Sequence, residues 1–179
     1  MFQSFLFAAT FTHAPLSFQY DEKNWELVES AKPKAPDSVD AKMQGKTVVT
    51  LQRKNADEKY RARFSIVVDS LEKAKPQKGE APYRAYTRYS QAFLKSQRFS
   101  VLDSRKMKVG LPAYEATDST LFQRDFGLKF RQVIFVRGAD AYLLTFTSRM
   151  KPFDDYGKEI EELLSTLRFS EPVAFKHNS

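Results

Sequence analysis

Histidine, cysteine and clustered carboxylates build most catalytic and metal sites, and this chain supplies few of them. Its two histidines, His13 and His177, lie near opposite ends of the sequence, and it has no cysteine. A Ser-His-Asp triad or a histidine-rich metal site would have to be assembled from those two ends. Thiol nucleophiles, disulfides and thiolate metal sites are excluded, and no glycine-rich phosphate loop, HExxH or EF-hand pattern occurs. The sequence therefore predicts no catalytic site, no metal site and no cofactor.

A cluster of carboxylates lies near the C-terminal end of the chain. Its members are Asp154, Asp155, Glu159, Glu161 and Glu162. Such a group could bind a hard cation, because these ions prefer oxygen ligands. On a helix, however, Glu159 and Glu162 fall on the side away from the neighbouring leucines. We therefore interpret the cluster as a solvated helix face and not as a metal site.

The net charge of +7 is unevenly distributed along the chain. Residues 83–108 include one acid, Asp103, and seven basic residues, which are Arg84, Arg88, Lys95, Arg98, Arg105, Lys106 and Lys108. Residues 154–171 include six acids, and their basic residues are Lys158 and Arg168. This separation predicts a molecule with one basic and one acidic face.

The basic segment also carries tyrosines, and such a mixture can pair with phosphates and stack on bases. Its candidate residues for binding a partner are Arg84, Arg88, Lys95 and Arg98. Tyr86 and Phe93 nevertheless recur at helical spacing, so we expect these rings to face a sheet. The cations then form an ordinary charged surface, or a docking face for an acidic protein or an anionic membrane. Nucleic acid is the least favoured partner.

Trp25 is the only tryptophan, and it lies at the end of a predicted hairpin. A tryptophan there can anchor the core or present a large contact surface to a partner. We favour the core anchor and keep Trp25 as a candidate contact residue.

The elements that must position these residues follow from periodicity. Alternating apolar residues at 16–20 and 25–28 flank a polar turn, which predicts a hairpin. Further strands are expected at 47–52, 61–69, 101–109, 113–121, 128–137 and 140–148. Turn-prone residues connect the last four, which therefore predict a meander. Residues 133–136 are apolar on both faces, so their strand should lie inside the sheet with cover on both sides.

Two helices are expected. Residues 83–99 contain no glycine or proline and carry an apolar stripe. The second helix begins near Pro152, with Asp154 and Asp155 in its first turn, where the helix dipole favours anions. Its apolar stripe consists of Phe153, Tyr156, Ile160, Leu163, Leu164 and Leu167. Prolines and glycines predict loops at 30–45 and 73–82.

The length of 179 residues and the apolar content of 42% predict one domain, which we place at 16–169, with a loose tail at 170–179. No run approaches the ~20 apolar residues that cross a bilayer. Residues 1–15 are interpreted either as an atypical export signal ending near Ala14 or as an N-terminal strand or arm. The first interpretation favours a periplasmic or secreted location over the cytoplasm.

Three stretches, together with the order of elements, suggest a family. They are 18–25 (FQYDEKNW), 132–148 (QVIFVRGADAYLLTFTS) and 163–169 (LLSTLRF). Over about residues 16–169 the chain resembles the PsbP-like superfamily, which includes PsbP, DcrB-like envelope proteins, the Ran guanine-nucleotide release factor and the Eag chaperones. Asp21 and Glu22 depart from the proline that members often carry before the tryptophan. The resemblance implies an α+β fold, an α/β/α sandwich with a mainly antiparallel sheet flanked by helices.

The missing catalytic groups and this resemblance predict a noncatalytic accessory protein that binds a protein partner, in the bacterial cell envelope. The alternative is a cytosolic chaperone or adaptor of a secretion system, which would hold an apolar segment of its client. The fold hosts unrelated roles, so the sequence does not identify the partner.

Overall fold

The computed structural model describes residues 8–28, 45–54 and 60–170. The loop predicted at 30–45 and the tail predicted at 170–179 lie almost entirely outside these residues. Residues 8–13 form a strand, and whether the segment 1–15 is an export signal stays a prediction.

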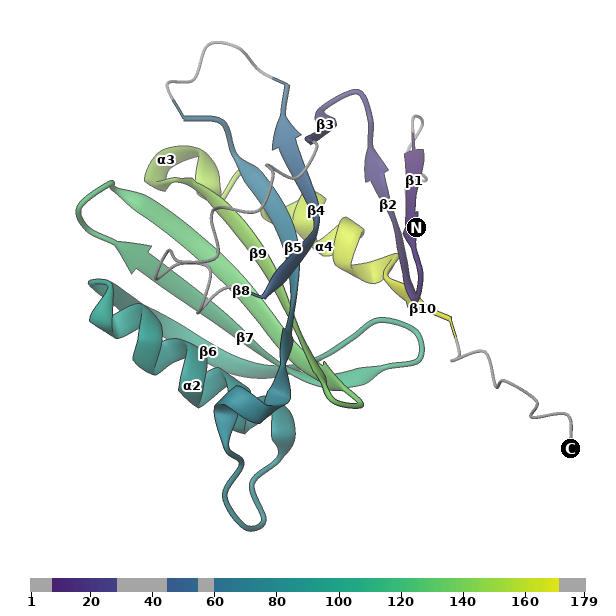
Figure 1. Ribbon diagram of the computed structural model, residues 1–179. Helices are drawn as coiled ribbons and strands as arrows, with labels where there is room; N and C mark the ends of the chain where they lie inside the picture. Colours follow the sequence, from purple (N-terminus) through teal and green to yellow (C-terminus); the bar gives the residue numbers. More distant parts are fainter. Residues whose placement is uncertain (1–7, 29–44, 55–59, 171–179) are drawn as a thin grey trace, which may run out of the picture.

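A seven-stranded antiparallel sheet forms the centre of the molecule (Figure 1). In spatial order its strands are β3 (Trp25–Val28), β4 (Lys46–Arg53), β5 (Arg63–Ser70), β9 (Asp140–Arg149), β8 (Leu128–Arg137), β7 (Tyr114–Gln123) and β6 (Phe99–Val109). Strands β6 to β9 are consecutive neighbours, which confirms the predicted meander. Strands β4 and β5 are also found where alternation predicted them.

A second, three-stranded sheet was not predicted. It consists of β1 (Ala8–His13), β2 (Leu16–Asp21) and β10 (Arg168–Phe169). The predicted hairpin is wrong in its pairing, because β2 joins this small sheet whereas β3 joins the large one. Alternation shows that a strand buries one face, but it does not show which strand lies beside it. Here Phe18 of β2 buries its ring against Phe64 of the large sheet, with 6.0 Å between ring centroids.

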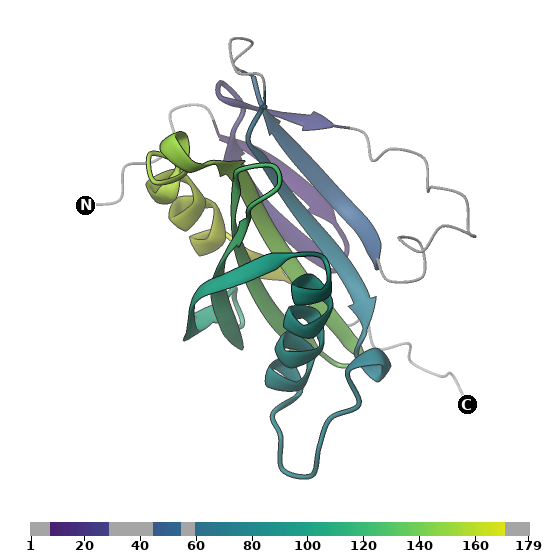
Figure 2. The same ribbon diagram turned by 90° about the vertical axis from the view of Figure 1, so that its left-hand side faces the viewer.

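Helices and the small sheet cover the two faces of the large sheet (Figure 2). Helix α2 (Pro82–Ser96) confirms the first predicted helix; it follows the short helix η1 (Leu71–Ala74) and packs on β6, β7 and β8. On the other face lie α3 (Met150–Phe153), α4 (Gly157–Ser165) and the small sheet. None of the helices in the described residues is long and apolar enough to cross a membrane.

The second predicted helix is two helices. A turn at residues 154–156 separates α3 from α4, so Asp154 and Asp155 lie in that turn and not in the first turn of a longer helix. Glycine has little intrinsic preference for helix, and α4 begins at Gly157. All six residues of the predicted apolar stripe are nevertheless buried.

Strand β8 is buried on both faces, as its sequence predicted. Val133 and Phe135 belong to the core beneath α4 and the small sheet, whereas Ile134 packs with Tyr86 of α2 on the opposite face. Gly110 allows the chain after β6 to approach this core, because it has φ +80° and a Cβ there would lie 3.0 Å from the Phe169 ring.

Replacing Phe135 should test the importance of this core. Its ring is fully buried and stacks on Tyr142, with 5.0 Å between centroids, and meets the edge of Phe169. We expect Phe135→Ala to lower the free energy of unfolding by about 3–5 kcal/mol, because it leaves a cavity. Urea denaturation measures this value. The exposed Phe126 provides a matched control, and Phe126→Ala should change it by no more than about 0.5 kcal/mol; equal losses would contradict the packing described.

Candidate functional site

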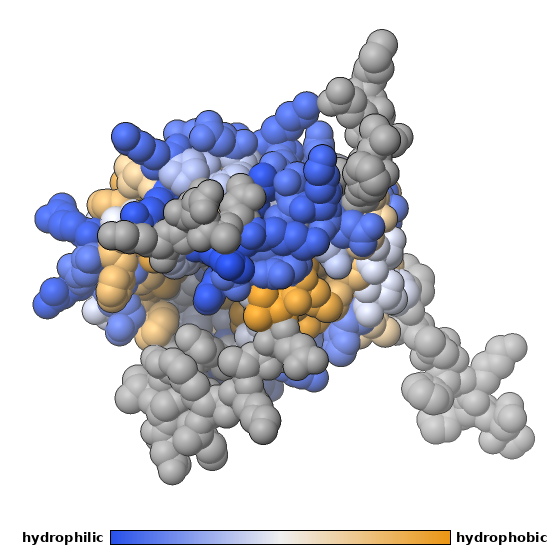
Figure 3. Space-filling model, turned by 90° about the horizontal axis from the view of Figure 1, so that it is seen from above, coloured by the Kyte–Doolittle hydropathy of each residue, from blue (hydrophilic) through white to orange (hydrophobic). Residues whose placement is uncertain are grey.

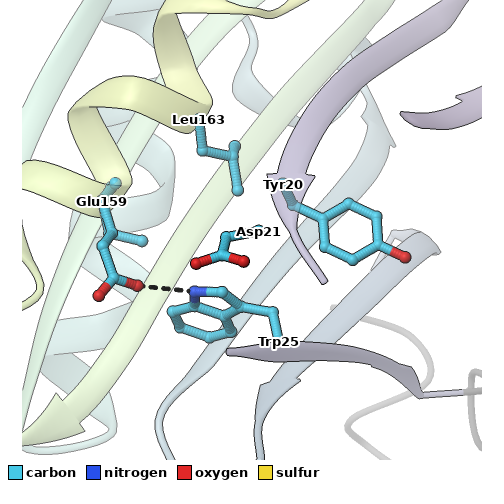
Figure 4. Close-up of a pocket in the computed structure, with 6 residues that line it drawn as sticks. Tyr20, Asp21, Trp25, Glu159 and Leu163 are labelled. Carbon is cyan, nitrogen blue, oxygen red and sulfur yellow. Dashed lines mark hydrogen bonds between the residues drawn. The ribbon is translucent and has the colours of Figure 1, made fainter. Parts of the chain in front are cut away.

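Glu159 of α4 holds two side chains from the edge of the large sheet. Trp25 begins β3 and Arg53 ends β4, and the strand register places them opposite each other. The Trp25 Nε1–H donates to Glu159 Oε2 at 2.9 Å (Figure 4), and Arg53 Nη1 donates to the same oxygen. The Arg53 guanidinium also lies 4.8 Å from the centroid of the Tyr156 ring. This cluster ties α4 to the sheet edge through a charge-assisted network.

A small hollow lies beside this cluster, between β2, β3 and α4 (Figure 4). Its lining residues are Tyr20, Asp21, Trp25, Glu159, Ile160 and Leu163. The cavity volume is about 10 Å³, close to the space that one water molecule needs. Drug-sized ligands occupy pockets of roughly 300 Å³ or more. The hollow therefore suits a bridging water and not a substrate.

The position of Glu159 corrects the prediction of a solvated face. On the helix, Glu159 lies one turn before the buried Leu163, so it borders the apolar stripe and reaches β3 and β4. Glu162 pairs with Lys158 at 4.0 Å along the helix. The two glutamates are three residues apart and so are neighbours on α4, but only Glu159 reaches the edge of the large sheet.

Trp25 lies in the core. Its side chain is 3% exposed and packs edge-on against Phe146 and Tyr156. Trp25 therefore lies where the core-anchor interpretation placed it, and its ring is not exposed for contact with a partner in this structure.

A second network uses charges from both the basic and the acidic segments. Asp118 of β7 is buried and accepts hydrogen bonds from Arg105 of β6 and Arg131 of β8. Arg131 also pairs with Glu161 of α4 at 2.8 Å. Arg105 and Glu161 thus contribute to one network, which reduces the predicted separation of charge.

A third network, which the sequence reasoning missed, joins α2 to β5. The Tyr86 hydroxyl donates to Asp69 Oδ2 at 2.5 Å, and Lys73 Nζ donates to Oδ1 at 2.6 Å. Burial raises the pKa of Tyr86 above its usual value, and the hydrogen bond to Asp69 raises it further. The position of Asp69 in the sequence could have indicated this network. Asp69 alternates with the apolar residues of its strand and so faces α2, and Lys73 follows four residues later.

The basic face of α2 is on the surface. Arg84, Arg88 and Lys95 follow each other along the exposed side of the helix, and Arg98 lies just after its end. Arg88 donates two hydrogen bonds to Glu80, and these bonds lower the pKa of Glu80 to about 2. Arg98 forms a long ion pair with Asp125, with 3.7 Å between Nη1 and Oδ2. The structure therefore places three of the four predicted cations on one side of α2 and Arg98 just beyond it, apart from the buried Trp25.

Metal and nucleic-acid chemistry gain no support from the described residues. His13 ends β1 with an exposed side chain whose ring stacks on Phe11, with 6.5 Å between ring centroids, and His177 is outside the described part of the chain. In the ranges that the structure describes, no three histidine, aspartate or glutamate side chains could hold a metal ion. Tyr83 and Tyr86 are buried, so these rings are not available to stack on bases.

Known structures share this architecture. No protein-family model matches the chain, and no curated protein matches it either. The cyanobacterial PsbP protein (CyanoP) of Synechocystis sp. PCC 6803 has a TM-score of 0.57 at 7% identity, over 94% of this chain and 95% of that one. A protein of unknown function from Pseudomonas aeruginosa has a TM-score of 0.53 at 14% identity, over 93% and 99%. The fold is therefore an α+β, PsbP-like fold.

Neutralising Glu159 should destabilise the protein. In Glu159→Gln, Arg53 would keep its charge in a mostly buried place without a counter-charge, so we expect a loss of about 1–3 kcal/mol in the free energy of unfolding. The matched control is Glu162→Gln on the same helix, which should cost less than about 0.5 kcal/mol. Chemical denaturation compares the two. Similar values for both would mean that the Trp25–Arg53–Glu159 cluster does not hold α4.

Alkaline pH should weaken the fold partly through Tyr86. Because its pKa is raised in the folded state, its contribution is complete below about pH 10 and declines as the pH rises further. Above about pH 10 we expect the free energy of unfolding to fall less steeply with pH in Tyr86→Phe than in the wild type. The two slopes should differ by up to about 1.4 kcal/mol per pH unit. Tyr60 and Tyr142 also have raised pKa values, and they contribute equally to the pH dependence of the wild type and of Tyr86→Phe. Parallel pH profiles would contradict this assignment.

Proposed function

We propose that this chain is a noncatalytic accessory protein of the bacterial cell envelope, which binds a protein partner through the basic face of α2. One observation carries the proposal. The carboxylates of the buried clusters are bound to cations of the protein itself, whereas Arg84 and Lys95 are exposed and make no ion pair within the described residues. Arg84 donates a hydrogen bond to the Tyr83 hydroxyl at 3.2 Å, but no counter-charge neutralises Arg84 or Lys95 there, so both can pair with an acidic partner.

The chemistry of α2 suits an acidic protein surface. Exposed cations on one side of a helix speed association with acidic partners and set its salt dependence. Nucleic acid fits less well, because Tyr83 and Tyr86 are turned into the core. An envelope location rests on the apolar start of the chain and on the family resemblance. The chaperone alternative needs an apolar groove for a client, and the hollow beside Trp25 has room for about one water.

Charge reversal on α2 should test the proposal. Arg84→Glu/Lys95→Glu should reduce the amount of envelope protein that crosslinks to the purified chain by about fivefold or more, and raised salt should have the same effect on the wild type. Lys46→Glu/Lys158→Glu changes the net charge equally at exposed positions away from α2, so it should crosslink like the wild type. Equal recovery with all three proteins would remove the support for α2 as the binding face.

A further inference from the structure

Several strands and two helices meet at one end of the large sheet. The register places Phe99 opposite Gln123, Gln123 opposite Leu128, and Leu128 opposite Arg149, so β6, β7, β8 and β9 reach this end together. Helix α2 ends just before β6, and α3 begins just after β9. We call this part the hairpin end. It consists of residues 98–102, 123–128 and 149–151.

The hairpin end exposes large apolar side chains. Phe126 is 71% exposed, Leu102 55% and Met150 48%. These are three of the five exposed large hydrophobic residues in the described part of the chain; the others are Leu27 and Leu111. A single exposed apolar residue needs no explanation, but three that gather at one end do. On the left of Figure 3, apolar and hydrophilic side chains alternate over this end.

These apolar side chains project from the molecule. Phe126 lies in the turn between β7 and β8, where Gly127 N–H donates to Arg124 O at 3.3 Å and Gly127 has φ +61°. Leu102 sits at an irregularity in β6, between Val101 and Asp103, and β6 is the edge strand of the sheet. The apolar surface is therefore a set of tips and not a groove.

Cations surround the apolar tips. Arg124, Arg149 and Lys151 are exposed and make no ion pair within the described residues. Of the nearby acids, Asp125 pairs with Arg98 and Asp154 with Lys129. Asp103, next to Leu102, and Asp155 are the remaining exposed acids, so three cations without an ion pair face two such acids.

We propose that the hairpin end docks on an anionic membrane surface. Phe126, Leu102 and Met150 enter the interfacial layer, while Arg124, Arg149 and Lys151 face the lipid phosphates. Projecting apolar tips fit a fluid headgroup layer, which adapts to them, whereas a protein partner would need a matching pocket for each. The contact is peripheral, and it goes beyond the protein-binding role of α2. Arg84 lies about 18 Å along α2 from Ser96 and so stays clear of this surface, whereas Lys95, in the last turn of α2, lies next to it.

Vesicle cosedimentation tests the proposal with defined lipids. The full chain should bind vesicles of equal parts phosphatidylcholine and phosphatidylglycerol, bind phosphatidylcholine alone weakly, and lose binding as salt is raised. Phe126→Ser should weaken binding to the anionic vesicles by about tenfold, because serine has no aromatic ring to transfer from water into the lipid interface. Arg124→Gln and Arg149→Gln should each weaken it by about fivefold.

The control is another exposed apolar residue. Leu111 is 54% exposed and lies next to β10, so Leu111→Ser should bind anionic vesicles like the wild type. All four variants change exposed side chains, and a circular dichroism spectrum checks that each is folded.

Three results would overturn the proposal. They are a wild type that stays in the supernatant with anionic vesicles, equal losses for Phe126→Ser and Leu111→Ser, and loss of the crosslinked protein partner in Phe126→Ser with vesicle binding unchanged. The last result would make the hairpin end a protein interface. Failure of the α2 charge reversal to affect crosslinking would leave the vesicle result intact, so the two proposals fail separately.

Discussion

Burial of β8 on both faces determines the layers of this protein. Val133 and Phe135 require cover on one side and Ile134 requires it on the other. Helix α2 provides one cover; α4 and the small sheet provide the other. The small sheet needs both ends of the domain, because β2 pairs with β10. A distant pairing thus completes the core, and it forms only when the domain is nearly whole.

Polar networks attach these covers in defined positions. Asp69 accepts from Tyr86 beneath α2, while Glu159 and Glu161 reach from α4 to Arg53 and Arg131 of the large sheet. Hydrophobic packing alone is not directional, whereas these hydrogen bonds fix where each helix lies. The same networks give several buried or half-buried carboxylates a counter-charge from a neighbouring element.

Periodicity predicted the individual elements because it reports which side of each element is buried. It could not report partners: the alternation of Leu16 and Phe18 is the same for a hairpin strand and for a strand packed in a second sheet. The break before α4 had a weak signal in Gly157, because glycine disfavours helix, but one glycine does not by itself predict that a helix divides. Glu159 was misplaced for a related reason, since a residue bordering an apolar stripe can face either solvent or a neighbouring strand. The hairpin end was predicted only as turns, because exposure of Phe126 has no signature in the sequence.

The two proposed surfaces are built on the same strands, since α2 packs on β6 to β8, whose ends contribute to the hairpin end. A protein that docks by the hairpin end would therefore present Arg84 in a fixed orientation, away from the lipid. Restricting a protein to a surface raises its effective concentration toward partners on that surface, so two weak contacts can together give a stable association. A weak electrostatic contact through the basic face of α2 would then be sufficient to hold the partner. The pairing of Arg88 with Glu80, which occupies one of the cations, would lower the affinity only a little.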